Sequence, residues 1–189
     1  VKIKNGEVID RLQSFVNPGK KIGTRVSQLT NITNEMVADA PAIKEFLPQI
    51  LEFFGDAILV AHNAKFDIGF LNESLKRLNQ KPITNPVIDS LALARAIMKP
   101  MKSYRLGNVC RVYRVNYDDD VAHRADYDAE GTAYAFYKFC KEFDAQNIST
   151  TTKLVASIDT ESLVKFAYPF HATIIAKNRD GLKNLFKII

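Results

Sequence analysis

The sequence contains no tryptophan and only two cysteines among its 189 residues. The cysteines, Cys110 and Cys140, are too few for a disulfide framework and are typical of a protein from a reducing compartment. No apolar stretch approaches the ~20 residues that span a membrane, and the first six residues lack the apolar core of a signal peptide. These absences exclude a disulfide-rich secreted fold. They favour a cytoplasmic location, without a membrane partner.

The composition is ordinary for a globular protein. Hydrophobic residues make up 47% and charged residues 25% of the chain, which excludes wholesale disorder, a collagen-like repeat and a coiled coil. The net charge of +5 is compatible with a polyanionic partner. The length suits one compact domain with a short appendage.

Strands alternate with helices over the first three quarters of the sequence. Asn5-Gly6 predicts the type I′ turn of a β-hairpin over residues 1–17, whose second strand runs from Val8 to Val16. The further predicted elements are a short helix after Thr33, a helix over 42–54 that Pro48 kinks or splits, a strand over 57–61, a helix over 66–79, a strand at 87–88, and helices from Asp89 or Ser90 to Met98, over 103–113 and over about 126–143. This order predicts an α/β fold with a mostly parallel sheet.

A first polar segment, from His62 to Asp67, begins where the apolar strand 57–61 ends. Ligands of open α/β proteins bind at this carboxyl end of the strands, where a carboxylate can hold a divalent metal ion. Asn63 or Asp67 also fits the simpler role of a helix cap, and Phe66 fits a core position.

A second polar segment, from His123 to Asp128, precedes and enters the predicted helix 126–143. Its position puts Asp128 in the first turn, with His123 in the loop before it. Histidine is the natural proton acceptor near neutral pH. The alternative interpretation is an acidic helix start that complements the helix dipole, preceded by a solvated histidine.

Together the two segments resemble the DnaQ-like family of 3′–5′ exonucleases, in the branch with a histidine in its third motif (DEDDh). The segment from Leu29 to Met36, followed by Ala40-Pro41, and the segment from Val87 to Leu91 are similar to this family as well. The resemblance covers residues 1 to about 143 and implies a ribonuclease H-like mixed sheet flanked by helices. Within the family, the sequence is most similar to the proofreading domains of bacterial replicative DNA polymerases.

The resemblance also implies roles for individual residues. Asp128 and Asp67 correspond to ligands of a site for two Mg²⁺ or Mn²⁺ ions, and His123 to the group that takes the proton from the attacking water. The implied substrate is the 3′ terminus of single-stranded DNA, and the implied partners are the rest of the polymerase polypeptide and the replisome. The residues implied in substrate binding are His62, Asn63, Phe66 and Thr30.

One family motif has no counterpart in the sequence. The family carries an Asp-x-Glu pair on its first, central strand, which is expected before Val1; Asp10 follows the hairpin turn and is a poor substitute. With two of four metal-binding carboxylates absent, we expect little nuclease activity from these 189 residues alone. The first residue, Val1, and the apolar end of the chain predict a fragment of a longer polypeptide.

The domain organisation follows the same resemblance. Residues 1–143 are predicted to form the exonuclease domain, and the polar residues 144–167 a linker. Residues 168–189 resemble the point where an outer polymerase-and-histidinol-phosphatase (PHP) domain resumes. Two alternatives stay open at this point: a relative that trims RNA, and a catalytically incomplete nucleic-acid-binding or interaction module of the same fold.

Overall fold

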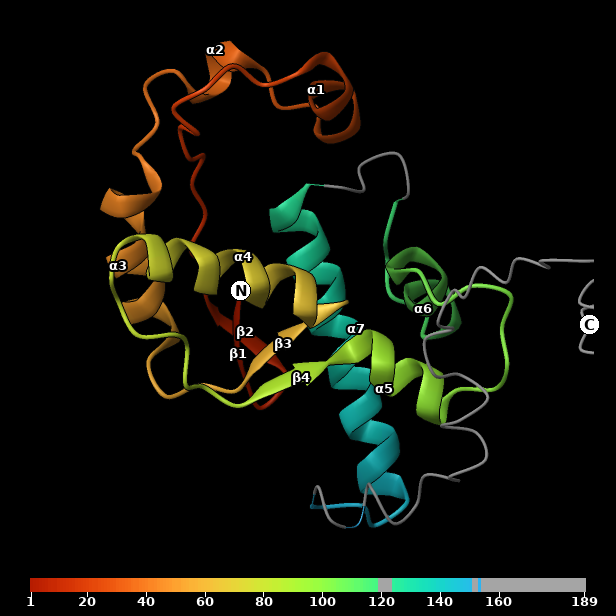
Figure 1. Ribbon diagram of the computed structural model, residues 1–189. Helices are drawn as coiled ribbons and strands as arrows, with labels where there is room; N and C mark the ends of the chain where they lie inside the picture. The colour runs from red at the N-terminus through yellow and green to blue at the C-terminus, as the bar shows by residue number, and fades with distance from the viewer. Residues whose placement is uncertain (119–123, 151–152, 154–189) are drawn as a thin grey trace, which may run out of the picture.

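The computed structural model describes residues 1–118, 124–150 and 153 (Figure 1). In these residues four strands form two small sheets, and seven helices make up most of the remaining regular structure. The strands are β1 (Lys2–Lys4), β2 (Glu7–Asp10), β3 (Leu59–Ala61) and β4 (Val87–Asp89). The helices are α1 (Thr24–Thr30), α2 (Asn34–Val37), α3 (Ile43–Phe54), α4 (Ala64–Arg77), α5 (Ser90–Ile97), α6 (Leu106–Val112) and α7 (Ala125–Ala145). The predicted α/β class is confirmed.

The predicted hairpin is present, with a shorter second strand. Strands β1 and β2 pair antiparallel around Asn5-Gly6, whose φ angles of 54° and 84° suit a type I′ turn. Gly6 also lies against the ring of Tyr137, which leaves no room for a Cβ. The expectation that the second strand reaches Val16 was wrong. Lys2 at the start of β1 already pairs with Asp10, so later residues have no partner strand.

Strands β3 and β4 form a parallel pair, with Ala61 opposite Asp89 at their carboxyl ends. Helix α4 begins three residues after β3, and α5 follows β4 directly, so the starts of both helices gather at this edge (Figure 1). The predicted apolar strand 57–61 is shorter and less buried than expected. It begins at Leu59, is half-buried throughout, and pairs on one side only within the described part of the chain.

The carboxylate of Asp89 joins the two helix starts. Its Oδ1 accepts hydrogen bonds from the backbone N–H groups of Leu91 (2.9 Å) and Ala92 (3.3 Å), which caps α5 as predicted. The same oxygen accepts from Asn63 N–H (3.1 Å), and Oδ2 accepts from Ala64 N–H (3.2 Å) at the start of α4. One side chain therefore fixes the geometry of both strand–helix junctions.

The main core lies between α5, α6 and α7. Phe139 of α7 is fully buried and meets the ring of Tyr113 edge-on at 4.9 Å. Burial of this apolar surface is the main stabilising contribution to the packing of α7 on α6. The buried residues of this core are Leu93, Ala94, Tyr104, Val109, Cys110, Ala135 and Phe139.

One helix was not expected from the sequence, and another, which Pro48 was expected to kink or split, is not split. Helix α1 was not predicted; it has no buried residue, so its apolar periodicity is weak. Helix α3 continues through Pro48 without being split. The buried side chains of Phe46 and Leu47 pack its first turns in place and offset the missing backbone donor.

Helix α7 continues to Ala145, two residues past position 143, and the division into domains stays a prediction. Most of the predicted linker 144–167 and all of the PHP-like segment 168–189 lie outside the described residues. Among the helices that the structure describes, none has the length and apolar character to cross a bilayer.

Substitution of Asp89 is expected to lower the stability of the fold. In Asp89→Asn a single amide oxygen replaces two carboxylate oxygens that serve four N–H donors. We expect a loss on the order of 2 kcal/mol in the free energy of unfolding, because both helix starts lose acceptors. Urea unfolding followed by circular dichroism measures it. The exposed Asp56→Asn is the control, and equal losses in both variants would contradict the role of Asp89.

Candidate active site at the carboxyl ends of the parallel strands

Asp67 and Asp128 come together from distant parts of the sequence. Asp67 lies in the first turn of α4 and Asp128 in the first turn of α7. Asp67 is exposed to solvent as a residue, but partial desolvation of its carboxylate raises its pKa, and the negative charges of Asp128 and Asp89 raise it further. The negative charges of Asp128 and Asp89 therefore act on Asp67 at the strand ends, and a cation bound by Asp67 and Asp128 would relieve the repulsion between these two carboxylates.

The carboxylate of Asp128 is held by a neighbouring side chain. Its Oδ1 accepts a hydrogen bond of 2.5 Å from the hydroxyl of Tyr117, in the segment that follows α6. Its backbone N–H donates to the carbonyl of Arg124 (2.9 Å), which closes the first turn of α7. The side chain is half-buried, so one part of it stays accessible.

His62 points into the fold. Its Nε2 lies 2.8 Å from the backbone carbonyl of Tyr104, and its Nδ1 lies 3.1 Å from the hydroxyl of the buried Ser90. A carbonyl only accepts, so Nε2 carries a proton. Burial lowers the pKa of His62, which favours the neutral ring. Both ring nitrogens are thus engaged within the fold, and the predicted contact of His62 with substrate stays a prediction.

A shallow groove of about 490 Å³ runs along α4, and Asn63, Lys65 and Phe66 contribute to it. Phe66 and Phe70 are 60% and 63% exposed, and their rings meet edge-on with centroids 4.8 Å apart. Exposed aromatic rings beside a lysine suit the stacking of bases and the attraction of phosphates. The alternative interpretation of Phe66 as a core residue does not hold.

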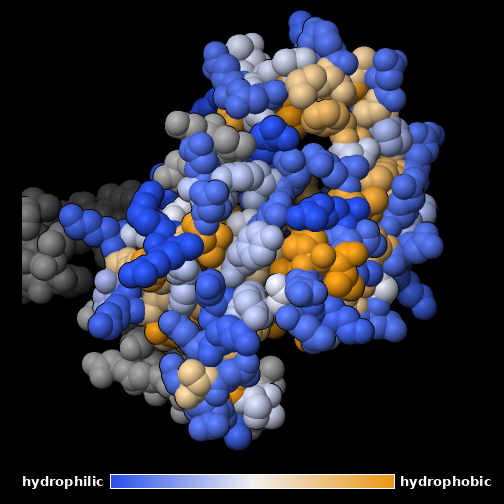
Figure 2. All heavy atoms as spheres, turned by 180° about the vertical axis from the view of Figure 1, so that it is seen from behind, coloured by the Kyte–Doolittle hydropathy of each residue, from blue (hydrophilic) through white to orange (hydrophobic). Residues whose placement is uncertain are grey.

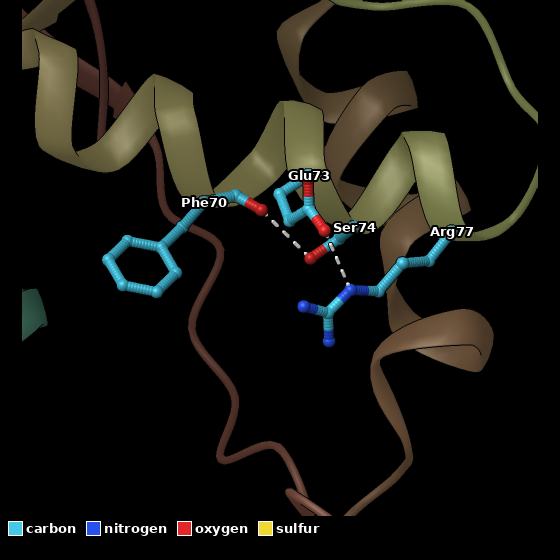
Figure 3. A network of polar contacts seen from close by, with 4 residues as sticks. All are labelled: Phe70, Glu73, Ser74 and Arg77. Atoms are coloured by element: carbon cyan, nitrogen blue, oxygen red, sulfur yellow. Dashed lines mark hydrogen bonds and ion pairs between the residues drawn. The ribbon is translucent and has the colours of Figure 1, made fainter.

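The outer part of α4 carries one ion pair within the helix. Figure 3 shows the Phe70 ring pointing away from the helix, with Glu73, Ser74 and Arg77 following it. Glu73 pairs with Arg77 at 3.0 Å, and the Ser74 hydroxyl donates to the Phe70 carbonyl at 2.9 Å. The Glu73–Arg77 pair largely cancels its own charge.

One of the predicted site residues, Thr30, is not brought to Asp67, and another cannot be placed. Thr30 ends α1, where its hydroxyl donates to the Val26 carbonyl (2.9 Å). Figure 1 shows α1 and α2 at the top of the molecule, apart from the start of α4. His123 lies outside the described residues.

The donor set fits part of a divalent-metal site. Mg²⁺ and Mn²⁺ prefer carboxylate oxygens, which Asp67 and Asp128 offer, whereas both Asp89 oxygens already accept from backbone N–H groups. Across residues 1–118, 124–150 and 153, no cluster of three or more His, Cys, Asp or Glu could hold a metal ion. These residues therefore supply at most two carboxylate ligands.

Sequence reasoning missed two contributors to this site. Asp89 was expected to be a possible cap of α5, and nothing in the local sequence shows that it also holds the start of α4. Tyr117 carries no motif at all, because its contact with Asp128 depends on how the segment after α6 packs against α7.

Comparison with known proteins identifies the family to which the chain belongs. The family model RNase_T, described as Exonuclease, matches residues 1–136. DNA polymerase III PolC-type of Staphylococcus epidermidis is 41% identical over 189 residues, and that of Oceanobacillus iheyensis is 38% identical; each match covers 100% of this chain and 13% of the relative. The chain thus spans about an eighth of the length of these relatives (13%).

A structure of exonuclease X in complex with 5′ overhanging duplex DNA is similar in fold. Its TM-score is 0.59 and its sequence identity 25%, over 75% of this chain and 79% of that one. The predicted resemblance to PolC-type proofreading domains and the predicted ribonuclease H-like fold are thereby confirmed. This chain therefore belongs to the exonuclease family.

Proposed function

We propose that this chain is the 3′–5′ proofreading exonuclease domain of a PolC-type replicative DNA polymerase, and that it removes nucleotides from the 3′ end of single-stranded DNA. The observation that carries the proposal is the approach of Asp67 and Asp128 at two helix starts beside the strand ends. The similarity to PolC-type polymerases along the whole chain supports the polymerase context. Two free cysteines agree with a cytoplasmic location.

The family resemblance supports a role for each of these residues, and the placement of Asp67 and Asp128 at two helix starts agrees with it. Asp128 and Asp67 would hold two divalent cations, Mg²⁺ or Mn²⁺, together with ligands outside the described residues. When bound, these ions supply positive charge for the attacking and leaving oxygens of phosphodiester hydrolysis. His123 takes the proton of the attacking water. Phe66 and Asn63, at the edge of the α4 groove, contact the terminal nucleotides.

A second function has one observation in its favour. The described residues contain no cluster of three metal-binding side chains, as expected for a module that binds nucleic acid without cleaving it. The exposed Phe66 and Phe70 would serve such a module equally well. Substitution at Asp128 separates the two functions.

Asp128→Asn removes a negative ligand and keeps the size of the side chain. In the full-length polypeptide we expect exonuclease activity to fall about 100-fold or more, because the cation loses an anionic oxygen. Release of nucleotides from 5′-labelled single-stranded DNA with Mg²⁺ measures it, and polymerase activity reports intact folding.

The matched control is Asp126→Asn, two residues before Asp128 in the same first turn of α7. Asp126 pairs with Arg124 at 3.0 Å, so its loss removes a surface ion pair without touching Asp128. An unchanged rate in Asp128→Asn, or equal effects in both variants, would favour the binding module.

Asp67→Asn is expected to raise the melting temperature of the metal-free chain. The pKa of Asp67 is raised on folding, so its ionised form lowers the free energy of unfolding. This destabilisation is absent below the pKa of the unfolded state, where the carboxyl is protonated in both states. It grows as the pH rises through the pKa of the folded state. Thermal unfolding at pH 3 and pH 7 tests this. The gain should appear at pH 7 and vanish at pH 3, and a gain at pH 3 alone contradicts the assignment.

Phe66→Ala is expected to weaken binding of a short single-stranded oligonucleotide about tenfold, because a stacked base contributes ~1–3 kcal/mol. Fluorescence anisotropy with a labelled oligonucleotide measures the dissociation constant. Phe15→Ala, an exposed phenylalanine outside the α4 groove, is the control. Equal binding by both variants would remove Phe66 from the substrate site.

A further inference from the structure

The segment after α6 turns back and runs along the start of α7. Arg114 adopts a left-handed conformation (φ 54°), and the N–H of Val115 donates to the Cys110 carbonyl at 2.9 Å. This reversal sends the next residues toward α7. It brings Tyr117 against the turn of α7 that carries Asp128.

Gly131 of α7 makes room for the Tyr117 ring. A Cβ at Gly131 would lie 2.6 Å and 2.9 Å from two carbon atoms of that ring, closer than van der Waals contact allows. Glycine inside a helix costs ~1 kcal/mol relative to alanine. The glycine here has a structural reason, because it lets the ring pack directly on the helix backbone.

A second contact fixes the orientation of the same ring. Tyr117 stacks on Tyr127, with centroids 5.0 Å apart and planes inclined by 28°. The Tyr127 hydroxyl in turn accepts a hydrogen bond of 2.6 Å from the N–H of Asp118. The ring is thus bounded by the α7 backbone and by a neighbouring aromatic side chain.

The hydroxyl of Tyr117 reaches Oδ1 of Asp128 at 2.5 Å. A phenylalanine ring would satisfy the packing on Gly131 and Tyr127, so the packing alone does not require this hydroxyl. A hydrogen bond to an ionised carboxylate is short and about twice as strong as a neutral one. A carboxylate has about four lone-pair sites, so this bond leaves oxygen lone pairs for a cation.

We propose that Tyr117, seated against Gly131, is a positioning residue that orients the Asp128 carboxylate for a divalent cation. This inference rests on the proposed function of Asp128 as a metal ligand. Without the hydroxyl, the carboxylate samples further rotamers and binds the cation from a smaller fraction of them. Loss of a residue that orients a metal ligand typically weakens metal affinity 10–100-fold.

The test compares Tyr117→Phe with Tyr134→Phe in the full-length polypeptide. Tyr117, Gly131 and Tyr134 together line one cavity. The hydroxyl of Tyr134 has no hydrogen bond to any residue that the structure describes. Direct titration with Mn²⁺ gives the dissociation constant, and exonuclease rates at increasing Mn²⁺ give the half-saturating concentration. Thermal unfolding without metal reports structural damage.

For Tyr117→Phe we expect about tenfold weaker Mn²⁺ binding, a rate restored at saturating Mn²⁺, and an unchanged melting temperature. Tyr134→Phe should match the unsubstituted protein in all three. Gly131→Ala, which displaces the ring, should weaken Mn²⁺ binding in the same direction and also lower the melting temperature.

Mn²⁺ binding in Tyr117→Phe that is equal to or tighter than in the unsubstituted protein overturns the proposal, as does equal weakening in Tyr134→Phe. Asp128→Asn separates this failure from failure of the proposed function. If Asp128→Asn weakens Mn²⁺ binding and Tyr117→Phe does not, only the positioning role is lost. If neither variant weakens it, Asp128 is not a ligand and both proposals fall.

Discussion

The four hydrogen bonds accepted by Asp89 are the constraint on which the rest of the site depends. They tie the start of α4 to the start of α5, and through Ser90 the start of α5 meets His62. His62 in turn contacts the Tyr104 carbonyl, next to the main core. The position of Asp67 on α4 is therefore determined by the half-buried side chain of Asp89, whose two carboxylate oxygens already accept backbone hydrogen bonds.

The acidic side chains at the strand ends differ in how well their negative charge is stabilised. Asp89 places its negative charge on helix N-terminal N–H groups, where it is stabilised. Asp67 and Asp128 lie in first turns as well, but the pKa of Asp67 is raised by burial and by its acidic neighbours. His62, which burial keeps neutral, offers no compensating positive charge. The fold thus concentrates negative potential where the proposed function needs a cation, and this costs stability while no cation is bound.

The sequence was informative where the cause of a structure is local. Asn5-Gly6 specifies its turn through two positive φ angles, and Asp89 caps the helix that follows it. The prediction that Asp67 and Asp128 share one site came from the resemblance to a family, because no spacing rule relates two helix starts so far apart in the sequence. Tyr117 had no signal, since its role arises only from packing on Gly131. Helix α1 was missed because it buries nothing and so leaves no apolar pattern.

The core between α5, α6 and α7 and the candidate site are energetically coupled. Phe139 and Ala135 are fully buried on the same helix whose first turn carries Asp128. Apolar burial on this helix, at ~25 cal/mol per Å², offsets the repulsion that arises when Asp128 lies near Asp67. The two carboxylates can approach only if α7 is held by contacts elsewhere along its length, since their own interaction drives them apart. A helix of 21 residues suits this requirement, because its buried middle turns are rigidly linked to its acidic first turn.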